Sequence, residues 1–221
     1  MCMIPVVINN RNLLSWPRAM VEKIKTYKGV GEIIIVDNGS SYPPLLEWYD
    51  TKPCKVIHLE NSGHHAPWNS GIISNLDAEY YVVTDPDLDL SNTPDDTLLF
   101  LKDKLMKQSH LGKIGLGLDW ECVGRKSPFH HYLNVSYEKP RWEASEIVDD
   151  VYVNVKVDTT FAIYNKQSGF IRVGGGSVSH PYVARHLPWE FSKEEARNNT
   201  EFTYYMENAN RSSSYKRKGY W

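Results

Sequence analysis

Short apolar segments alternate with amphipathic ones through the first 120 residues, and this alternation is the feature that most restricts the fold. The apolar segments are rich in Val and Ile, as buried strands are. Helix signals stand between these segments. Ser15 is expected to cap a helix with Pro17 in its first turn, further prolines follow, and residues 93–96 read Thr-Pro-Asp-Asp, a typical helix start. We expect strands at 3–9, 32–36, 54–59, 79–84 and 113–118, with helices between them, including one over 67–76.

Elements in this order predict the α/β class, a Rossmann-like, mostly parallel mixed sheet with helices on both faces, in a single domain over residues 1–221. Ligands of such folds lie at the carboxyl ends of the strands, near a change in strand order. Polar residues follow four of the predicted strands, at 10–12, 37–40, 61–63 and 85–87. Asn, Asp, Gly and Ser also form plain turns, but their repetition at four strand ends favours a binding site.

Three carboxylates follow the fourth predicted strand at alternating positions: Asp85, Asp87 and Asp89. In an extended chain they would share one side, where they would repel one another unless a cation lay between them. Oxygen ligands suit Mg²⁺ or Mn²⁺, ions that commonly hold phosphates as well. An EF-hand loop is disfavoured because its sixth position is Leu90 rather than Gly. An acidic turn without a metal is the open alternative.

Composition narrows the classes of function. A net charge of −2 over 221 residues offers no field that would draw the chain to nucleic acid. The three cysteines are widely spaced and odd in number, which argues against a disulfide framework or a zinc site and fits a reducing compartment. Neither a signal peptide nor an apolar run of about 20 residues is visible. We therefore expect a cytoplasmic protein.

The second half has less regular patterning. Residues 151–157 alternate as a half-exposed strand does, residues 158–164 predict another strand, and residues 194–209 predict one polar helix. Residues 211–221 form a basic, aromatic tail that would suit peripheral contact with an anionic membrane or a lipid diphosphate. A frayed end is the alternative reading of that tail.

Four segments, in their order along the chain, resemble the nucleotide-sugar-dependent glycosyltransferases of the GT-A fold, and are similar to family 2. They are PVVINNRN at 5–12, IIIVDNGS at 33–40, Asn61 and Gly63 followed by NSG at 69–71, and TDPD at 84–87. The resemblance covers roughly residues 3–120 well and the remainder more loosely. It implies a nucleotide-sugar-binding half at 1–120, and an acceptor-binding half with a tail at 121–221.

The resemblance also implies roles for residues in the donor site. The segment with the glycine would lie along the nucleotide, where glycine permits a close backbone approach. The residues implied to contact the donor are Asn10 and Arg11 near the ribose and phosphate, Asp37 at the uracil N3–H, and Asn61, Gly63, Asn69 and Asp85.

For the metal, the resemblance implies Asp85 and Asp87, with Asp87 as the direct ligand. It adds His186, in the run RHLPW, as a late histidine that completes the metal or diphosphate shell. A hydrogen-bonded structural histidine is the alternative for His186.

An inverting enzyme needs a carboxylate that takes the proton of the acceptor hydroxyl. We expect Asp158 to be this catalytic group, because in related enzymes the strand that follows it faces the acceptor. The usual Glu-Asp pair of the family is not evident in this chain. Other candidates therefore stay open, namely Glu190, Glu194 and Glu195, and more weakly Asp119 and Glu143.

The resemblance therefore predicts a metal-dependent, inverting glycosyltransferase that uses Mn²⁺ or Mg²⁺. It would move a sugar from a UDP-sugar to a glycan or glycolipid hydroxyl. A nucleotidylyltransferase is one alternative, although NNRNLLSWP lacks the glycines of such enzymes' first loop. A non-catalytic nucleotide- or carbohydrate-binding module is another. A dinucleotide-dependent oxidoreductase is disfavoured because no G-x-G-x-x-G follows the first strand.

Overall fold

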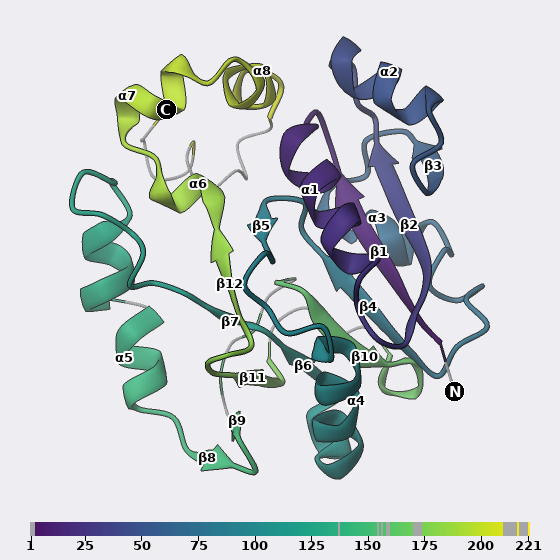
Figure 1. The fold of residues 1–221 in the computed structure, drawn as a ribbon, viewed down its shortest axis with the longest axis vertical. Helices are drawn as coiled ribbons and strands as arrows, with labels where there is room; N and C mark the ends of the chain where they lie inside the picture. The colour runs from purple at the N-terminus through teal and green to yellow at the C-terminus, as the bar shows by residue number, and fades with distance from the viewer. Residues whose placement is uncertain are drawn as a thin grey trace.

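The computed structural model describes residues 3–136, 138–153, 155, 157, 160–169, 174–209, 216 and 221. Its centre is a nine-stranded sheet with the order β3-β2-β1-β4-β10-β6-β11-β9-β8 (Figure 1). The first four strands are parallel: β1 (Ile4–Asn10), β2 (Val30–Asn38), β3 (Lys55–Leu59) and β4 (Tyr80–Thr84). Because the chain moves from β1 through β2 to β3 on one side and then returns to place β4 on the other, the strand order changes between β1 and β4. In open α/β sheets, ligands bind at such a change in strand order, outside the carboxyl ends of the strands.

The second half of the chain extends this sheet in mixed directions. β10 (Ala162–Asn165) lies antiparallel between β4 and β6 (Lys113–Gly115). Beyond β6 follow β11 (Gly176–Val178), β9 (Val151–Tyr152) and β8 (Ile147–Val148). The predicted α/β class is confirmed, with a sheet that is parallel in its first four strands and mixed beyond them.

A second, three-stranded sheet has the order β5-β12-β7. Its strands are β5 (Leu88–Asp89), β12 (Val183–His186) and β7 (Gly117–Leu118). The prediction of one strand over 113–118 is therefore wrong, because the chain leaves the large sheet after Gly115 and enters the small one at Gly117. A Cβ on Gly117 would lie 2.5 Å from the carbonyl oxygen of Val178, so only glycine fits at this crossing.

The two faces of the large sheet are covered by different elements. Val6 and Ile8 of β1 point to the face that is covered by α1 (Ser15–Ile24) and α4 (Thr97–Lys107). Val7 points to the opposite face, against Ala66 and Tyr81. This period-two alternation in a strand buried on both sides explains its continuous apolar sequence.

The helix predicted over 67–76 is much shorter in the structure. A 3₁₀ turn at Gly63–His65 leads into α3, which covers only Ala66–Asn69. Gly71 follows with φ +78°, a left-handed conformation that ends a helix. Residues 70–76 are turns, of which Ile73 is buried against the second face of the sheet.

The helix predicted over 194–209 is divided into two. Asn199 is extended, ends α7 (Lys193–Asn198), and caps α8 (Thr200–Asn208) by accepting from the Phe202 N–H at 2.9 Å. Aromatic and apolar side chains of α8 form a third hydrophobic cluster with Trp16 of α1 and with Trp189. The remaining helical segments are α2 (Pro43–Asp50), α5 (Glu138–Glu143), α6 (Leu187–Glu190), the 3₁₀ turns Ser109–Leu111 and Lys166–Ser168, and a π-helical segment at Tyr132–Ser136.

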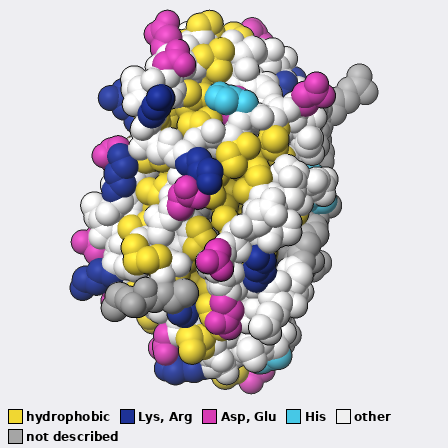
Figure 2. All heavy atoms as spheres, turned by 90° about the vertical axis from the view of Figure 1, so that its right-hand side faces the viewer, with side chains coloured by type: hydrophobic (Ala, Val, Ile, Leu, Met, Phe, Trp, Pro, Cys, Tyr) yellow, Lys and Arg dark blue, Asp and Glu magenta, His cyan; other side chains and the backbone are white. Residues whose placement is uncertain are grey.

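The strands predicted at 151–157 and 158–164 are described only in part. Strand pairing is seen at Val151–Tyr152 and Ala162–Asn165, while residues 154, 156, 158 and 159 lie outside the described residues. On the face near α2 and β3, side chains of both charges are interspersed around a band of hydrophobic ones (Figure 2). In the part of the chain that the structure describes, no helix has both the length and the apolarity needed to cross a bilayer.

Candidate active site

The small sheet brings the histidine of the RHLPW segment to the acidic turn after β4. β12 pairs antiparallel with β5, so that His186 is opposite Leu88, and the Leu187 N–H donates to the Asp87 carbonyl oxygen at 3.0 Å. As a result, His186 Nε2 lies 3.6 Å from Asp87 Oδ2. Two of the three residues predicted to hold a metal thus lie side by side, although they come from opposite halves of the chain.

Both side chains of this pair keep unused polar atoms. Asp87 Oδ1 and His186 Nδ1 are buried and have no hydrogen-bond partner among the described residues. Burial lowers the pKa of His186 below its ordinary value, an effect that the nearby Asp87 carboxylate opposes. The imidazole is therefore neutral at pH 7 and has a nitrogen lone pair that can bind a cation. The Trp189 ring stacks on the imidazole, with 4.2 Å between the ring centroids.

The donor atoms of this pair fit a divalent cation. Carboxylate oxygen and neutral imidazole nitrogen are both ligands that suit Mn²⁺. No group of three or more His, Cys, Asp or Glu side chains among the described residues is arranged to hold a metal. A site with two protein ligands is typical of ions that take their remaining ligands from substrate phosphates and water. Asp85, the third predicted ligand, is half-buried, and its carbonyl oxygen accepts from Thr84 Oγ1 at 2.9 Å.

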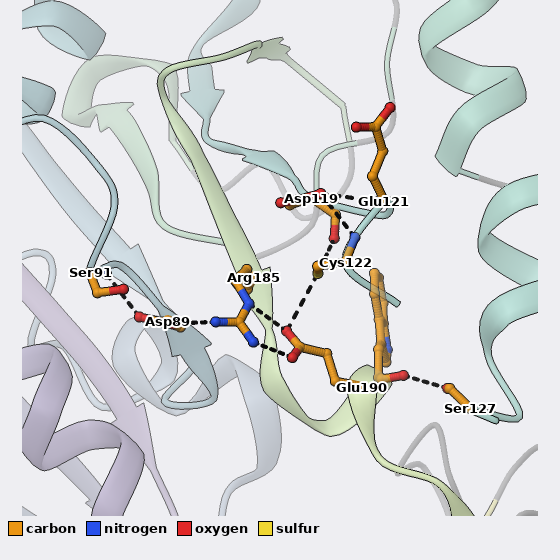
Figure 3. Close-up of polar contacts among 9 residues, drawn as sticks. Asp89, Ser91, Asp119, Glu121, Cys122, Ser127, Arg185 and Glu190 are labelled. Atoms are coloured by element: carbon orange, nitrogen blue, oxygen red, sulfur yellow. Dashed lines mark hydrogen bonds and ion pairs between the residues drawn. The ribbon is translucent and has the colours of Figure 1, made fainter. Parts of the chain in front are cut away.

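Asp89 is bound by a residue that the sequence did not single out. Arg185 Nη1 lies 3.1 Å from Asp89 Oδ2, and the same guanidinium binds both oxygens of Glu190, with 2.8 Å between Nε and Oε1 (Figure 3). These contacts raise the pKa of Arg185 above its already high value. The Arg185 guanidinium is thus the counter-charge of Asp89, and this ion pair strengthens the pairing of β5 with β12. Only its place next to His186 in the sequence could have drawn attention to Arg185.

A cavity of about 180 Å³ lies beside this network. The network also reaches the segment that follows β7. There Cys122 Sγ lies 3.5 Å from Glu190 Oε1, and Asp119 Oδ1 accepts from the backbone N–H of Glu121 at 3.0 Å (Figure 3). The cavity is lined by Asp89, Ser91, Asn92, Asp119, His180, Pro181, Val183 and Arg185.

The first donor loop is held by asparagines. Asn10 is fully buried, and its Nδ2 donates to the Leu13 carbonyl and to the Tyr49 hydroxyl, both at 2.8 Å. Its amide therefore shapes the loop after β1 from within. Arg11, the next residue, is half-buried and has an Nε atom without a hydrogen-bond partner among the described residues.

Asn12 connects the loop after β1 to the loop after β2. Its Oδ1 accepts from the backbone N–H of Ser41 at 2.7 Å and of Tyr42 at 3.0 Å. Its backbone is left-handed with φ +54°, a conformation that Asn tolerates better than most residues. The only signal of this role in the local sequence is a third polar residue after the strand, so the sequence did not predict it.

Asp37 and the loop after β3 lie at the same edge of the sheet. Asp37 is buried, with Oδ2 2.9 Å from His58 Nδ1 and Oδ1 accepting from the Ser40 N–H at 3.3 Å. The Gly63 carbonyl accepts from Asn38 Nδ2 at 2.7 Å, and Asn61 Oδ1 accepts from the Gly63 N–H at 3.1 Å. Four of the predicted donor residues thus lie at the carboxyl ends of the first three strands: Asn10 and Asp37 at the ends of β1 and β2, and Asn61 and Gly63 in the segment after β3. Asn69 is the exposed last residue of α3.

The candidates for the proton-accepting carboxylate differ in their surroundings. Asp158 lies outside the described residues, so its assignment stays a prediction. Glu190 is bound by Arg185, as described above, and Glu195 Oε2 accepts from the Ser192 N–H at 2.8 Å in a capping box. Glu194 and Glu143 are exposed, and Asp119 lines the cavity.

Comparisons with known proteins bear on the fold. No protein-family model matches the chain, and no curated protein does. Among solved structures, the mannosyltransferase PcManGT from Pyrobaculum calidifontis, in complex with GDP-Man and Mn²⁺, is similar with a TM-score of 0.51 and 15% identity, over 94% of this chain and 65% of that one. TarS of S. aureus is similar with a TM-score of 0.50 and 13% identity, over 94% of this chain and 40% of that one.

The chain therefore spans less than two thirds of the length of each of these proteins. At such low identity the likeness establishes the arrangement of elements alone. It confirms the fold that the sequence predicted: this chain has the GT-A fold, the Rossmann-like fold of nucleotide-sugar glycosyltransferases.

Proposed function

We propose that this protein is a metal-dependent glycosyltransferase that takes its sugar from a nucleoside diphosphate donor. The observation that carries the proposal is the Asp87–His186 pair, with 3.6 Å between Oδ2 and Nε2, in the turn after β4, next to the change in strand order between β1 and β4. The mannosyltransferase that shares the fold binds GDP-Man and Mn²⁺, which supports a divalent cation and a donor of this class.

In this proposal Asp87 and His186 hold the cation, and Asp85 lies next to it. When bound, Mn²⁺ or Mg²⁺ supplies positive charge that stabilises the departing nucleoside diphosphate. Trp189, stacked on the imidazole, keeps His186 in the orientation that directs Nε2 toward Asp87. The Arg185 pairs with Asp89 and Glu190 keep β12 in register with β5, which maintains the separation of the two ligands.

The donor nucleoside would lie over the loops after β1, β2 and β3. We propose a UDP-sugar, with Asp37 near the base and with Asn10, Arg11, Asn61, Gly63 and Asn69 shaping or contacting the remainder of the nucleotide. Arg11 is suited to the diphosphate because its Nε has a free donor in a half-buried place.

For the second half of the reaction we propose a hydroxyl of a glycan or glycolipid as acceptor, Asp158 as the base, and inversion at the anomeric carbon. The cavity beside Arg185 supports an acceptor rich in hydroxyl groups, because its lining combines carboxylate, amide and hydroxyl side chains. The division into a donor half at 1–120 and an acceptor half at 121–221 of a single domain is part of the same proposal, as are peripheral membrane contact through the tail and a cytoplasmic location.

The decisive experiment is calorimetric titration of the wild-type protein with UDP and GDP, with and without Mn²⁺, followed by an assay for hydrolysis of the matching nucleotide sugars. We expect uridine compounds to bind in a Mn²⁺-dependent way. Asp87→Asn and His186→Ala should each weaken this binding about tenfold or more, which corresponds to about 1.4 kcal/mol.

Asp103→Asn serves as the control, because it makes the same change at an exposed carboxylate of α4 that pairs with Lys107 and has no part in the proposed site. Equal binding of UDP with and without Mn²⁺, or unchanged binding by Asp87→Asn, would overturn the proposed role of the pair. Tight binding without turnover on a range of donors and acceptors would instead identify a non-catalytic nucleotide-binding module.

A further inference from the structure

Side chains of α8 hold the loops after β1 and β2, which belong to the proposed donor site. Glu201, in the first turn of α8, accepts from the backbone N–H groups of Leu14 and Ser15 at 2.8 and 3.0 Å, and from Ser15 Oγ at 2.6 Å. The N-terminus of α1 thus receives its cap from a residue 186 positions later in the sequence. The α1 segment has no side-chain cap of its own.

The same helix fastens the loop after β2. Tyr204, one turn beyond Glu201, donates from its hydroxyl to the Ser41 carbonyl oxygen at 2.9 Å, and lies 3.0 Å from Ser41 Oγ. Its ring lies against Tyr42 with 4.9 Å between the centroids. Because Asn12 joins the loops after β1 and β2, the contacts of Glu201 and Tyr204 hold one connected structure at two points.

Between Glu201 and Tyr204, α8 contributes the buried aromatic side chain of Phe202. Phe202 is buried and packs on Trp16 of α1, with 5.8 Å between the ring centroids, and on Phe191 at 5.5 Å. Phe191 directly follows α6, the helix that carries Trp189. Figure 1 shows α8 close to α1 at the top of the molecule, between α2 and the α6–α7 segment.

We propose that α8 is a positioning element for the donor site. The α8 brace, made of Glu201, Phe202 and Tyr204, holds the loops after β1 and β2 in their binding conformation and thereby sets the affinity for the donor nucleotide. This inference rests on the proposed function for its link to the donor. The coupling is reciprocal, so a bound nucleotide in turn stabilises α8 against opening.

The experiment compares Glu201→Ala, Glu201→Gln and Tyr204→Phe with the wild type. Hydrogen exchange measured by mass spectrometry reports on residues 12–15 and 39–42, and titration with UDP in saturating Mn²⁺ reports on the donor site. We expect faster exchange in both loops for Glu201→Ala, and UDP binding weakened about fivefold or more, the lower range of measured couplings between sites. Turnover at saturating donor should be unchanged, because no brace residue touches the Asp87–His186 pair.

Ile24→Val is the matched control. It removes one methyl group from a buried residue at the far end of α1, and so lowers stability without disturbing either loop. A role in stability alone predicts that Glu201→Ala and Ile24→Val both lower the melting temperature while UDP affinity is the same in both. That result would overturn the inference. Tyr204→Phe, which loses only a hydroxyl group, gives the same comparison if Glu201→Ala does not fold.

The outcomes also separate this inference from the proposed function. A wild-type protein that binds no nucleotide would overturn the proposed function and the link of α8 to donor affinity. Faster exchange in residues 12–15 and 39–42 of Glu201→Ala would then still support the brace itself. Unchanged exchange in those loops would overturn the brace, whatever the protein binds.

Discussion

Removal of the Arg185 guanidinium tests how the small sheet holds the site together. Arg185 bridges Asp89 of β5 and Glu190 of α6, and the side chains of these two carboxylates are only 22% and 20% exposed. In Arg185→Met both carboxylates would remain partly buried without their counter-charge. Exposed ion pairs contribute about 0–1 kcal/mol each, whereas breaking a fully buried pair costs about 3–5 kcal/mol. For these two half-buried contacts we expect a loss of about 2 kcal/mol.

For a chain of this length, each kcal/mol shifts the melting temperature by about 2–4 °C, so Arg185→Met should melt about 4–8 °C below the wild type. Thermal unfolding followed by circular dichroism at pH 7 measures this shift. Mn²⁺ affinity should fall in the same variant, because the pairing of β12 with β5 sets the distance between Asp87 and His186.

Lys23→Met is the control, since it breaks an ion pair whose Asp95 side chain is 56% exposed, and should cost less than about 1 kcal/mol. The double variant Arg185→Met/Glu190→Gln should recover part of the lost stability, because it removes one of the two stranded charges. A melting temperature for Arg185→Met no lower than that of Lys23→Met would refute this account of the bridge.

Three further predictions concern other parts of the molecule. Burial raises the pKa of the Cys54 thiol to about 11 and that of the Cys122 thiol to about 12, so both stay protonated at pH 8. Their alkylation at pH 8, followed by mass spectrometry of the peptides, should therefore be much slower than in the denatured protein. Equal alkylation rates would contradict this. Gly117→Ala should destabilise the protein by about 1–3 kcal/mol, because the new Cβ would collide with the Val178 carbonyl, whereas Gly124→Ala, with open space around it, should be close to neutral in denaturant titration. Asn199→Ala should cost about 1 kcal/mol by removing the cap of α8, and should raise hydrogen exchange at the Phe202 amide; unchanged exchange there would argue against the cap.

Local patterns in the sequence predicted the parts of the fold that depend on local preference. Strands β1 and β2 contain runs of Val and Ile, and β4 is a run of Tyr and Val; all three lie within one or two residues of their expected positions. The acidic turn was recognised for the same reason, because its three aspartates directly follow such a run. His186 was linked to it only through resemblance to a known family, since the pairing of β12 with β5 is not visible in the spacing of residues.

The features that were missed depend on contacts between distant segments. Residues 113–118 have the apolar pattern of one strand, but the close approach of Val178 at Gly117 divides them between two sheets. Ser15 was expected to cap α1, yet Glu201 fills that place. No pattern within either segment could show that a carboxylate nearly at the other end of the chain would be available.

The pairing of β12 with β5 has a consequence for the order in which parts of the protein form during folding. Asp87 is synthesised early and sits in a parallel βαβ region, whereas its partner His186 arrives about a hundred residues later, in the middle strand of a sheet that joins both halves. Contacts of such long sequence separation form late in folding. A nascent or truncated chain that ends before β12 would therefore present the acidic turn without its imidazole, and the capacity to retain a cation would be one of the last properties that the folding chain acquires.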